Sequence, residues 1–252
     1  MEFNVWKKQY DGYQNRIPLI DRTIHNEDDM FNKAVNGWDD YLLVGKSAIF
    51  TIYNALLPSR LNEVGSFLDF GCGHGRVARH LRFAFPCAKL FYSDIDDTAW
   101  QYCAAQYDGI GFSSEADFNN LIIPEKIDII WLGSVFTHLN WGRSLALWRK
   151  LFDALKVNGI IVATFRGFES YNMMISNPER FNHGGYYDQM LNEYLNIGFG
   201  YQDYKGYKNW GQNLFSIQKI AELSQHTKNA RLVNYSEAGW ANIHDVAVWT
   251  KR

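Results

Sequence analysis

The stretch SFLDFGCGHGRVARHL, at residues 66–81, joins an apolar strand to an amphipathic helix through a turn that contains three alternate glycines. Glycine accepts a positive φ and places no Cβ in the path of a ligand, so the turn at Gly71, Gly73 and Gly75 leaves its backbone open. Unpaired amides and the positive end of the helix dipole favour an anion at such a position. The stretch therefore predicts a cofactor cradle, and a purely structural tight turn is the alternative.

The spacing of these glycines distinguishes between cofactors. Dinucleotide-binding folds use Gly-x-Gly-x-x-Gly, whereas this turn reads Gly-x-Gly-x-Gly with an aspartate two residues ahead of it. The pattern resembles motif I of the class I S-adenosylmethionine-dependent methyltransferases. The resemblance implies S-adenosylmethionine as cofactor, with its methionine end in the loop. The residues that it assigns to the cofactor here are Asp69, Gly71, Cys72, Gly73, Gly75 and Arg76.

Apolar and amphipathic runs alternate on both sides of the loop. A helix is expected over residues 41–57, which end before Pro58. Further strands are predicted at 66–70, 89–94, 110–113, 127–132 and 159–165, and further helices at 74–84, 97–107, 143–156 and 216–227. Two β-like runs, 230–235 and 244–250, permit an antiparallel hairpin at the end. Such alternation predicts a parallel sheet with the ligand crevice at the carboxyl ends of its strands.

Length and composition fit one α/β domain, because 252 residues that are 47% hydrophobic can bury a sizeable core. The expected architecture is the Rossmann-like class I methyltransferase fold, with a mostly parallel seven-stranded sheet, an antiparallel final strand and helices on both faces. The parts expected within the single domain 1–252 are an N-terminal cap and lead-in helix (1–57), a cofactor-binding core (66–165), an aromatic-rich substrate lid (168–215), and a C-terminal helix with a β-hairpin (216–252).

Charge and cysteine content indicate which partners and ligands are not expected. With 25 Lys plus Arg against 27 Asp plus Glu, the net charge is −2, and the chain has no basic run that could follow a phosphate backbone, so a nucleic-acid acceptor is not expected. Three cysteines without a Cys-x-x-Cys pair indicate neither a disulfide framework nor a metal site. No signal peptide or membrane span is apparent, and a cytoplasmic location is expected. The oligomeric state is left open.

Acidic residues follow the next two strands. Asp94 lies 23 residues after Gly71, where this architecture places a carboxylate beside the ribose, and Ile95 would then lie against the adenine. The alternative is a helix N-cap, a role that Asp96 or Asp97 also fits. The loop before the next strand places Asp117 and Phe118 near the adenine edge, with an ordinary solvated loop as the alternative for Asp117.

The run KIDIIWLGSVFTHL, at 126–139, is a second match to the family, which has a similar Asp-apolar run ending in Ser-x-x-x-His-Leu. It implies that Gly133 and Ser134 pass close to the sulfonium and that Val135 forms apolar wall. The Asn/Asp-Pro-Pro-aromatic run of adenine-amine and amide methylating enzymes is absent here. The likeness covers residues 41–165. With the late run at 239–246, it is similar to members associated with bacterial glycan and secondary-metabolite pathways.

His138 is the candidate general base for methyl transfer to an oxygen or nitrogen. An amine acceptor needs mainly alignment, whereas a hydroxyl acceptor gains from a base, and histidine titrates in the right range. The alternative is a histidine that only fixes its loop by hydrogen bonds to the backbone. His244 and Asp245 are neighbours on a predicted strand, so their side chains should point to opposite faces and cannot form a dyad.

Residues 168–215 interrupt the fold where this class commonly builds an acceptor lid, and twelve of these 48 residues are aromatic. Tyrosine and tryptophan offer a flat apolar face and a polar rim, which suits a sugar or another small polyhydroxylated acceptor. The aromatics could instead form a small core for the lid. Arg166 is a candidate for an acceptor phosphate or carboxylate, or it is a solvated charge at the rim. The substrate candidates are Arg166, Tyr171, Tyr186, Tyr187 and His244.

Two other functions remain open from the sequence. One is a methyltransferase-like binding module that has lost its chemistry, although the intact glycine loop and Asp94 speak against it. The other is a nicotinamide-dependent oxidoreductase, although its glycine spacing is absent.

Overall fold

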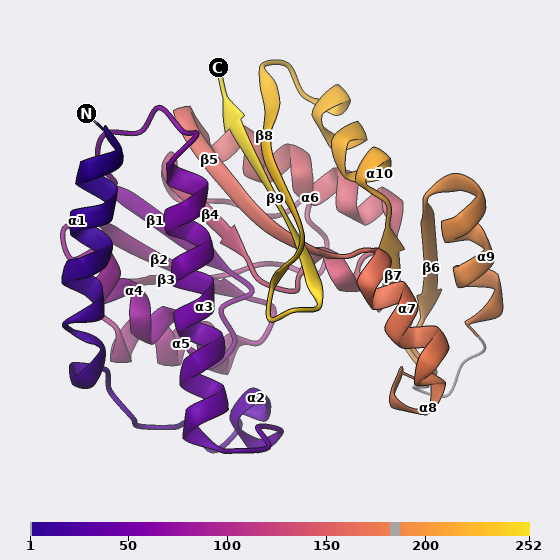
Figure 1. The fold of residues 1–252 in the computed structure, drawn as a ribbon, viewed down its shortest axis with the longest axis horizontal. Coiled ribbons are helices and arrows are strands. Elements are labelled where there is room, and N and C mark those ends of the chain that lie inside the picture. Colours follow the sequence, from indigo (N-terminus) through magenta and orange to yellow (C-terminus); the bar gives the residue numbers. More distant parts are fainter. Residues whose placement is uncertain (1, 182–186) are drawn as a thin grey trace.

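A computed structural model describes residues 2–181 and 187–252, and a seven-stranded sheet lies at its centre (Figure 1). The strand order, β3-β2-β1-β4-β5-β9-β8, places the first strand in the middle. β1 to β5 run parallel, and β9 pairs antiparallel with both of its neighbours, which confirms the predicted fold class. The strands are β1 (Ser66–Phe70), β2 (Lys89–Asp94), β3 (Ile110–Ser113), β4 (Ile127–Leu132), β5 (Leu155–Arg166), β8 (Ala230–Trp240) and β9 (His244–Lys251).

Helices cover both faces of this sheet because its strands are apolar on both sides. Successive residues of β1 point to opposite faces, so Phe67 joins one hydrophobic cluster and Leu68 the other. The helices that cover the first face are α1 (Glu2–Gln14), α3 (Trp38–Leu56), α4 (Ala78–Ala84) and α5 (Asp97–Gln106). Those that cover the second face are α6 (Trp141–Ala154) and α10 (Ile217–Glu222). None of the described helices combines the length and the hydropathy that a membrane span needs.

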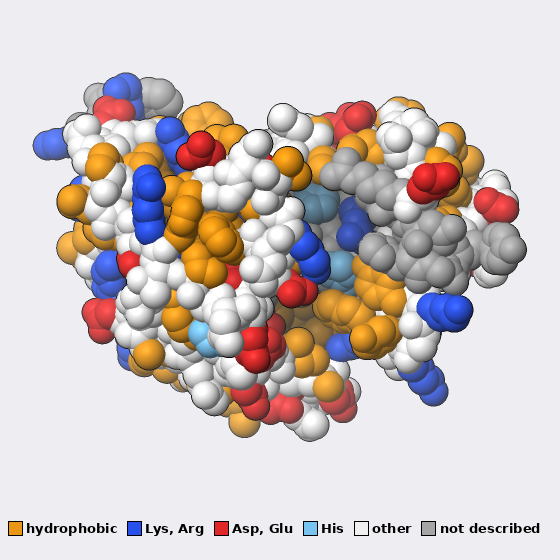
Figure 2. Space-filling model, turned by 90° about the horizontal axis from the view of Figure 1, so that it is seen from below, with side chains coloured by type: hydrophobic (Ala, Val, Ile, Leu, Met, Phe, Trp, Pro, Cys, Tyr) orange, Lys and Arg blue, Asp and Glu red, His pale blue; other side chains and the backbone are white. Residues whose placement is uncertain are grey.

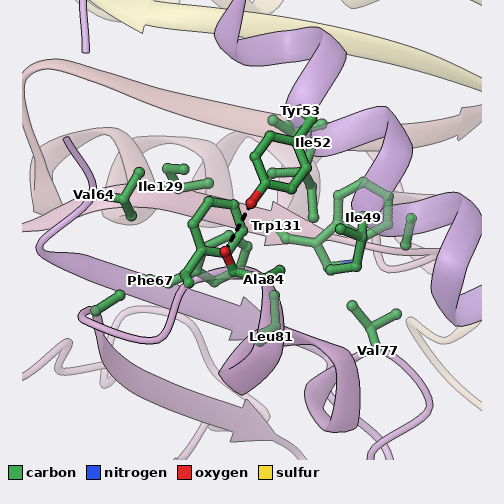
Figure 3. Packing of buried hydrophobic residues seen from close by; sticks show 14 of the residues in the cluster. Ile49, Ile52, Tyr53, Val64, Phe67, Val77, Leu81, Ala84, Ile129 and Trp131 are labelled. Carbon is green, nitrogen blue, oxygen red and sulfur yellow. Dashed lines mark hydrogen bonds between the residues drawn. The ribbon is translucent and has the colours of Figure 1, made fainter. Parts of the chain in front are cut away.

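The cluster on the first face joins α3 and α4 to the sheet (Figure 3). Ile52 of α3 and Trp131 of β4 pack in it around Phe67, and all three are buried. The hydroxyl of Tyr53 donates a hydrogen bond of 2.7 Å to the carbonyl of Ala84, the last residue of α4. This bond satisfies a carbonyl that the helix itself cannot pair, and so ties the end of α4 to α3.

The N-terminal region holds α1, a helix that was not predicted from the sequence. α1 packs Trp6 and Tyr13 against the first face, and the Tyr13 hydroxyl lies 2.8 Å from Nδ1 of His80 in α4. A short 3-10 helix (Ile17–Leu19) and α2 (Asp29–Asn32) follow. The region therefore covers the sheet face beside α3 and α4.

His80 makes the stability of this region depend on pH. Burial, and then the charges of Arg79 and Lys46, lower the pKa of His80 from 6.5 to about 3. Between these values the unfolded chain binds a proton that the folded chain cannot, so the free energy of unfolding falls as the pH falls below 6.5. We expect about 2 kcal/mol of this loss at pH 5 from His80. His244 also has its pKa lowered to about 3 and contributes in the same direction.

Urea unfolding of the wild type and of His80→Gln at pH 7.5 and pH 5 measures this loss. The variant should lose less stability between the two pH values than the wild type. Equal losses in both proteins would show that His80 does not stay neutral in the folded state.

The insertion, residues 168–215, forms a helical layer and a separate hairpin beyond β5 (Figure 1). Its elements are α7 (Phe168–Ser176), α8 (Pro178–Phe181), α9 (Asp188–Ile197), β6 (Phe199–Asp203) and β7 (Gly211–Phe215). Met174, Met190, Tyr194 and Leu214 form its own small core. Asn213 of β7 donates hydrogen bonds of 2.6 Å to the carbonyls of Phe136 and Leu139, which fastens the hairpin to the loop after β4.

Several predicted boundaries are wrong by a few residues. α4 begins at Ala78 rather than at 74, because turns occupy the residues that follow Gly73. The predicted helix 216–227 divides into α10 and a 3-10 helix (Leu223–His226), although Ser216 is its N-cap, as expected. β8 extends to Trp240, five residues beyond the predicted run, because its antiparallel pairing with β9 continues to His244.

Candidate functional site

A cavity of about 290 Å³ lies at the carboxyl ends of β1, β2 and β4, where the topology predicts a ligand crevice. We call it the cofactor cavity. The predicted residues that line it are Asp69, Gly71, Cys72, Gly73, Arg76, Asp94, Ile95, Phe118, Gly133, Ser134, Val135 and His138. Those that do not line it are Gly75, Asp117, Arg166, Tyr171, Tyr187 and His244, while Tyr186 lies outside the described residues.

The three glycines of the loop have different tasks. All three have a positive φ, of 79° at Gly71, 50° at Gly73 and 93° at Gly75. A Cβ at Gly71 would overlap Val135, and one at Gly75 would overlap Tyr107, so these two glycines allow close packing. A Cβ at Gly73 would meet nothing within 4 Å. Gly73 is therefore the glycine that faces open space, where a ligand can approach the backbone.

Asp69 is a buried carboxylate at the floor of the cofactor cavity. Among the described residues its Oδ2 has no hydrogen-bond partner. Burial, followed by the charge of Asp94, raises the pKa of Asp69 to about 8, although Arg76 opposes this. A buried acid without a partner is costly, and a bound cationic group would relieve that cost.

Asp94 lies beside the glycine loop at the end of β2. Its Oδ2 accepts a hydrogen bond of 2.8 Å from the amide of Gly73, and its Oδ1 accepts one of 3.1 Å from the amide of Asp96. Burial raises its pKa against the effect of these bonds. Asp96 is the N-cap of α5, since it accepts a bond of 2.9 Å from the amide of Thr98. Asp94 is thus not the helix cap, and it lines the cavity.

The loop after β3 corrects one prediction. Asp117 was expected near the adenine edge, but it is exposed, and its Oδ1 accepts bonds of 3.0 and 2.9 Å from the backbone amide and side chain of Asn119. Such local turns are a common use of aspartate in loops. Phe118 lines the cavity instead, with the Arg143 guanidinium 4.9 Å from its ring centroid. Ile95, which is 53% exposed, lines the cavity as well.

His138 ends the short 3-10 helix (Phe136–His138) after β4 and lines the cofactor cavity. Its Nδ1 lies 3.1 Å from the carbonyl of Gly211 and 3.0 Å from the hydroxyl of Tyr204. A carbonyl can only accept, so we assign the tautomer that pairs with Gly211, with the proton on Nδ1 and the lone pair on Nε2. The imidazole also stacks on Trp210, with centroids 4.8 Å apart.

Arg166 and His244 lie next to each other across the β5–β9 pairing. Arg166 donates a hydrogen bond of 2.7 Å from Nη1 to the carbonyl of Thr137, and it also bonds the side chain of Tyr204. Burial lowers its pKa, although the residue as a whole is only partly buried. Burial, and then the charges of Arg166, His138 and Arg76, lower the pKa of His244.

Asp245 of β9 and the tyrosines of the insertion are placed differently. Asp245 accepts hydrogen bonds from the Tyr235 hydroxyl and from the amide of Ala238, as expected for a residue that points away from its neighbour His244. The ring centroids of Tyr171 and Tyr194 lie 5.4 Å apart, within the small core of the insertion. Tyr187 also packs against that core, and it lies close enough to act on the charge of Arg166.

Several residues of the cavity wall were not predicted. Arg76, which was predicted, has its guanidinium 5.9 Å from the ring centroid of Trp240, and Trp240 in turn packs edge-on against Trp131. The wall residues that were not predicted include Asp28, Met30, Trp131, Arg143, Trp210 and Trp240. They come from distant parts of the chain, and no local pattern marks them as a group.

Residues 20–32, which we call the strap, contact the glycine loop through His25 and bring Asp28 and Met30 to the cavity. Arg79 holds the strap by donating bonds of 2.9 and 3.2 Å from Nη1 to the carbonyls of Asp21 and Thr23. His25 stacks on His74 with centroids 4.5 Å apart. Asp28 caps α2 and accepts a bond from the buried Tyr41 hydroxyl.

Comparison with known proteins adds to this geometry. A family model described as a methyltransferase domain, Methyltransf_12, matches residues 68–161. Residues 68–161 of this chain match a methyltransferase domain, and the fold around them is the Rossmann-like methyltransferase fold. A search of curated protein sequences found no match to the chain.

Solved structures share the fold of the methyltransferase. An S-adenosylmethionine-dependent methyltransferase from Clostridium acetobutylicum ATCC 824 is 12% identical, with 88% of this chain and 96% of that chain covered and a TM-score of 0.58. Magnesium protoporphyrin IX methyltransferase from Synechocystis PCC 6803 is 11% identical, with 97% and 95% covered and a TM-score of 0.55. Human N-acetylserotonin methyltransferase is 15% identical, with 95% and 66% covered and a TM-score of 0.52. At these identities the similarity shows the common fold.

Proposed function

We propose that this methyltransferase transfers a methyl group to an oxygen or nitrogen of a small-molecule or sugar acceptor that enters beside His138. The observation that carries the proposal is the cofactor cavity itself, which holds Asp69, Gly73 and Asp94 on one wall and His138 on another. Figure 2 shows the hollow between the core and the insertion, with histidine and Lys or Arg side chains in its depth and hydrophobic side chains along its lower edge. The hollow offers an acceptor a route to the cavity.

The described residues fit the parts of S-adenosylmethionine. The unpartnered Oδ2 of Asp69 suits the ammonium of the methionine end, and the nearby Arg76 suits its carboxylate. The open backbone at Gly73 leaves room for this end of the cofactor. Asp94 is a carboxylate that can accept bonds from ribose hydroxyls. Ile95 and Phe118 offer apolar surface to the adenine.

The loop after β4 supplies the remaining wall. The backbone at Ser134 has a φ of 65°, and its amide donates a bond of 2.7 Å to the Thr164 hydroxyl of β5. This bond fixes the turn that carries Gly133, Ser134 and Val135 along the cavity. We assign this turn to the side of the cavity where the sulfur of the cofactor lies.

Bound S-adenosylmethionine supplies a methyl group on a positively charged sulfur, which is open to in-line attack by a lone pair. The chain supplies alignment and a proton acceptor. Holding the reacting atoms near attack distance can lower the barrier by roughly 7–11 kcal/mol. Nε2 of His138 can remove the proton of an acceptor hydroxyl, because its Nδ1 is held by Gly211.

The insertion supports an acceptor with a polar rim and a flat face. Tyr194, Phe199 and Phe215 are buried in packing, which accounts for part of the aromatic excess. Trp210 and Tyr204 instead contact His138. A sugar ring can stack on such side chains while its hydroxyls meet polar groups. We therefore place the acceptor against Trp210.

Replacement of His138 by glutamine tests its role. With a hydroxyl acceptor, kcat should fall by about 10²–10⁴-fold, because the base is lost, while binding of S-adenosylhomocysteine stays near normal. Transfer of a labelled methyl group measures turnover, and calorimetry measures binding. His226→Gln, a histidine that pairs with Glu222 away from the cavity, is the matched control and should keep full turnover. Full turnover in His138→Gln would remove this histidine as the base.

A product screen with labelled cofactor against sugars, nucleotide sugars and amines tests the proposed function as a whole. We expect label in at least one sugar or small-molecule acceptor. If S-adenosylhomocysteine binds and no acceptor in these classes is labelled, the acceptor class proposed here is wrong.

A further inference from the structure

Arg166, His244, Tyr204 and Tyr187 form a basic corner beside His138, which we call the Arg166 corner. Arg166 reaches the carbonyl of Thr137, next to His138, and its guanidinium bonds Tyr204. The Tyr204 hydroxyl lies 3.0 Å from Nδ1 of His138. The guanidinium is therefore two hydrogen bonds away from the proposed base.

The Arg166 corner has no acidic counterion in the described part of the chain. The ion pairs formed there do not include Arg166, whose bonding partners are a carbonyl and a phenol. The groups whose charges act on Arg166 are two phenols, Tyr204 and Tyr187, and no carboxylate is among them. Residues 182–186, Asn-His-Gly-Gly-Tyr, contain no acid that could pair with it. The carboxylate of Asp245 is taken up by Tyr235 and Ala238.

Partial burial of this guanidinium without an anion carries a desolvation cost, since neither the carbonyl nor the phenol carries a full negative charge. The cost is lower when a ligand supplies the missing charge. His244 adds a second incomplete group, because its buried Nδ1 has no partner among residues 2–181 and 187–252. Arg166 and His244 are cross-strand neighbours in the β5–β9 pairing, so a single small ligand could reach both.

We propose that the acceptor carries a compact oxyanion, a carboxylate or a phosphate, that pairs with Arg166 and His244 while its nucleophile faces His138. This inference rests on the proposed methyl transfer at this site. Two hydrogen bonds of ordinary length separate the Arg166 guanidinium from Nδ1 of His138, a path of roughly 6 Å, so one small acceptor can contact both residues. An acidic sugar, a sugar phosphate and a hydroxy acid each meet that requirement.

Minimal anions test the corner without knowledge of the acceptor. The protein is first saturated with S-adenosylhomocysteine, and inorganic phosphate, benzoate or benzamide is then titrated while Tm is recorded. Benzamide is the neutral counterpart of benzoate. A ligand that binds the folded state raises Tm, so phosphate or benzoate should raise it and benzamide should not. A response to phosphate alone indicates a phosphorylated acceptor, and a response to benzoate alone indicates a carboxylate.

Variants of Arg166 test whether the rise in Tm comes from binding of the anion at this residue. In Arg166→Gln the apparent affinity for the anion should fall by about tenfold or more. Arg231→Gln, an exposed arginine on β8, is the control and should respond as the wild type does. Arg166→Lys keeps the charge but loses the planar fork, so it should keep the response to phosphate and bind benzoate several-fold more weakly. The lysine variant decides the matter if the glutamine variant does not fold.

The outcomes separate this inference from the proposed function. If the wild type binds S-adenosylhomocysteine but no anion raises its Tm, or if benzamide acts like benzoate, the corner does not bind an anion. If phosphate or benzoate raised the Tm of Arg166→Gln as much as that of the wild type, the inference would be overturned as well. Failure of the wild type to bind S-adenosylhomocysteine would instead contradict the proposed cofactor site.

Discussion

Replacing Asp94 with alanine is expected to weaken the binding of S-adenosylhomocysteine by about a hundredfold or more, because two hydrogen bonds to a charged acceptor are lost at about 1.5–3 kcal/mol each. The change also removes the partner of the Gly73 amide, which Asp94 holds at 2.8 Å. Ribose contact and loop position are therefore lost together. Isothermal titration calorimetry with the purified protein measures the effect.

Asp96→Ala is the control for this variant, since Asp96 lies two residues away and caps α5. It should cost about 1 kcal/mol of stability, as loss of an N-cap usually does, and leave cofactor affinity near the wild-type value. Asp94→Asn separates charge from shape, because its amide oxygen can still accept the Gly73 bond. Unchanged affinity in Asp94→Ala would show that the ribose is bound elsewhere.

Replacing Arg79 with methionine is expected to lower the free energy of unfolding by about 3 kcal/mol, since three carbonyls lose a charged donor. Arg79 is 1% exposed, and it bonds the carbonyls of Gly75, Asp21 and Thr23. Its guanidinium also lies 4.9 Å from the ring centroid of Tyr41. Urea unfolding gives the loss of stability, and calorimetry should show weaker cofactor binding, because the strap is no longer held against the glycine loop.

Arg82→Met provides the comparison for Arg79. Arg82 lies one turn further along α4 and pairs with Asp108, whose side chain is 95% exposed. Exposed pairs contribute about 0–1 kcal/mol, so this variant should unfold almost like the wild type and bind the cofactor normally. If Arg79→Met binds the cofactor as tightly as Arg82→Met, the strap does not support the cavity.

The strands were predictable because each is a short apolar run between turn residues. β1, β2, β3 and β4 have the predicted bounds. α1 was missed although Trp6, Tyr10 and Tyr13 are spaced by four and three residues, a helical period. Polar residues between them hid the pattern. The β6–β7 hairpin was missed because its strands are short and its loop is long.

The site was predictable where the chemistry lies within one turn and unpredictable where it depends on distant segments. Gly71, Gly73 and Asp94 follow strands directly, so topology alone brings them to one edge. The prediction that Asp117 lies near the adenine was wrong, because its carboxylate accepts a hydrogen bond from Asn119 in a local turn. Nothing near Asp28 in sequence shows that Arg79 holds its segment against the glycine loop.

The strap has a consequence for how this enzyme can be divided or recombined. The segment that matches the family model, 68–161, contains the glycine loop but not Asp28 and Met30, which close one side of the cavity. A chimera in which only this segment came from a relative would combine the relative's glycine loop with a strap that fits the original loop. The smallest exchangeable unit therefore begins upstream, at Ile20 or earlier.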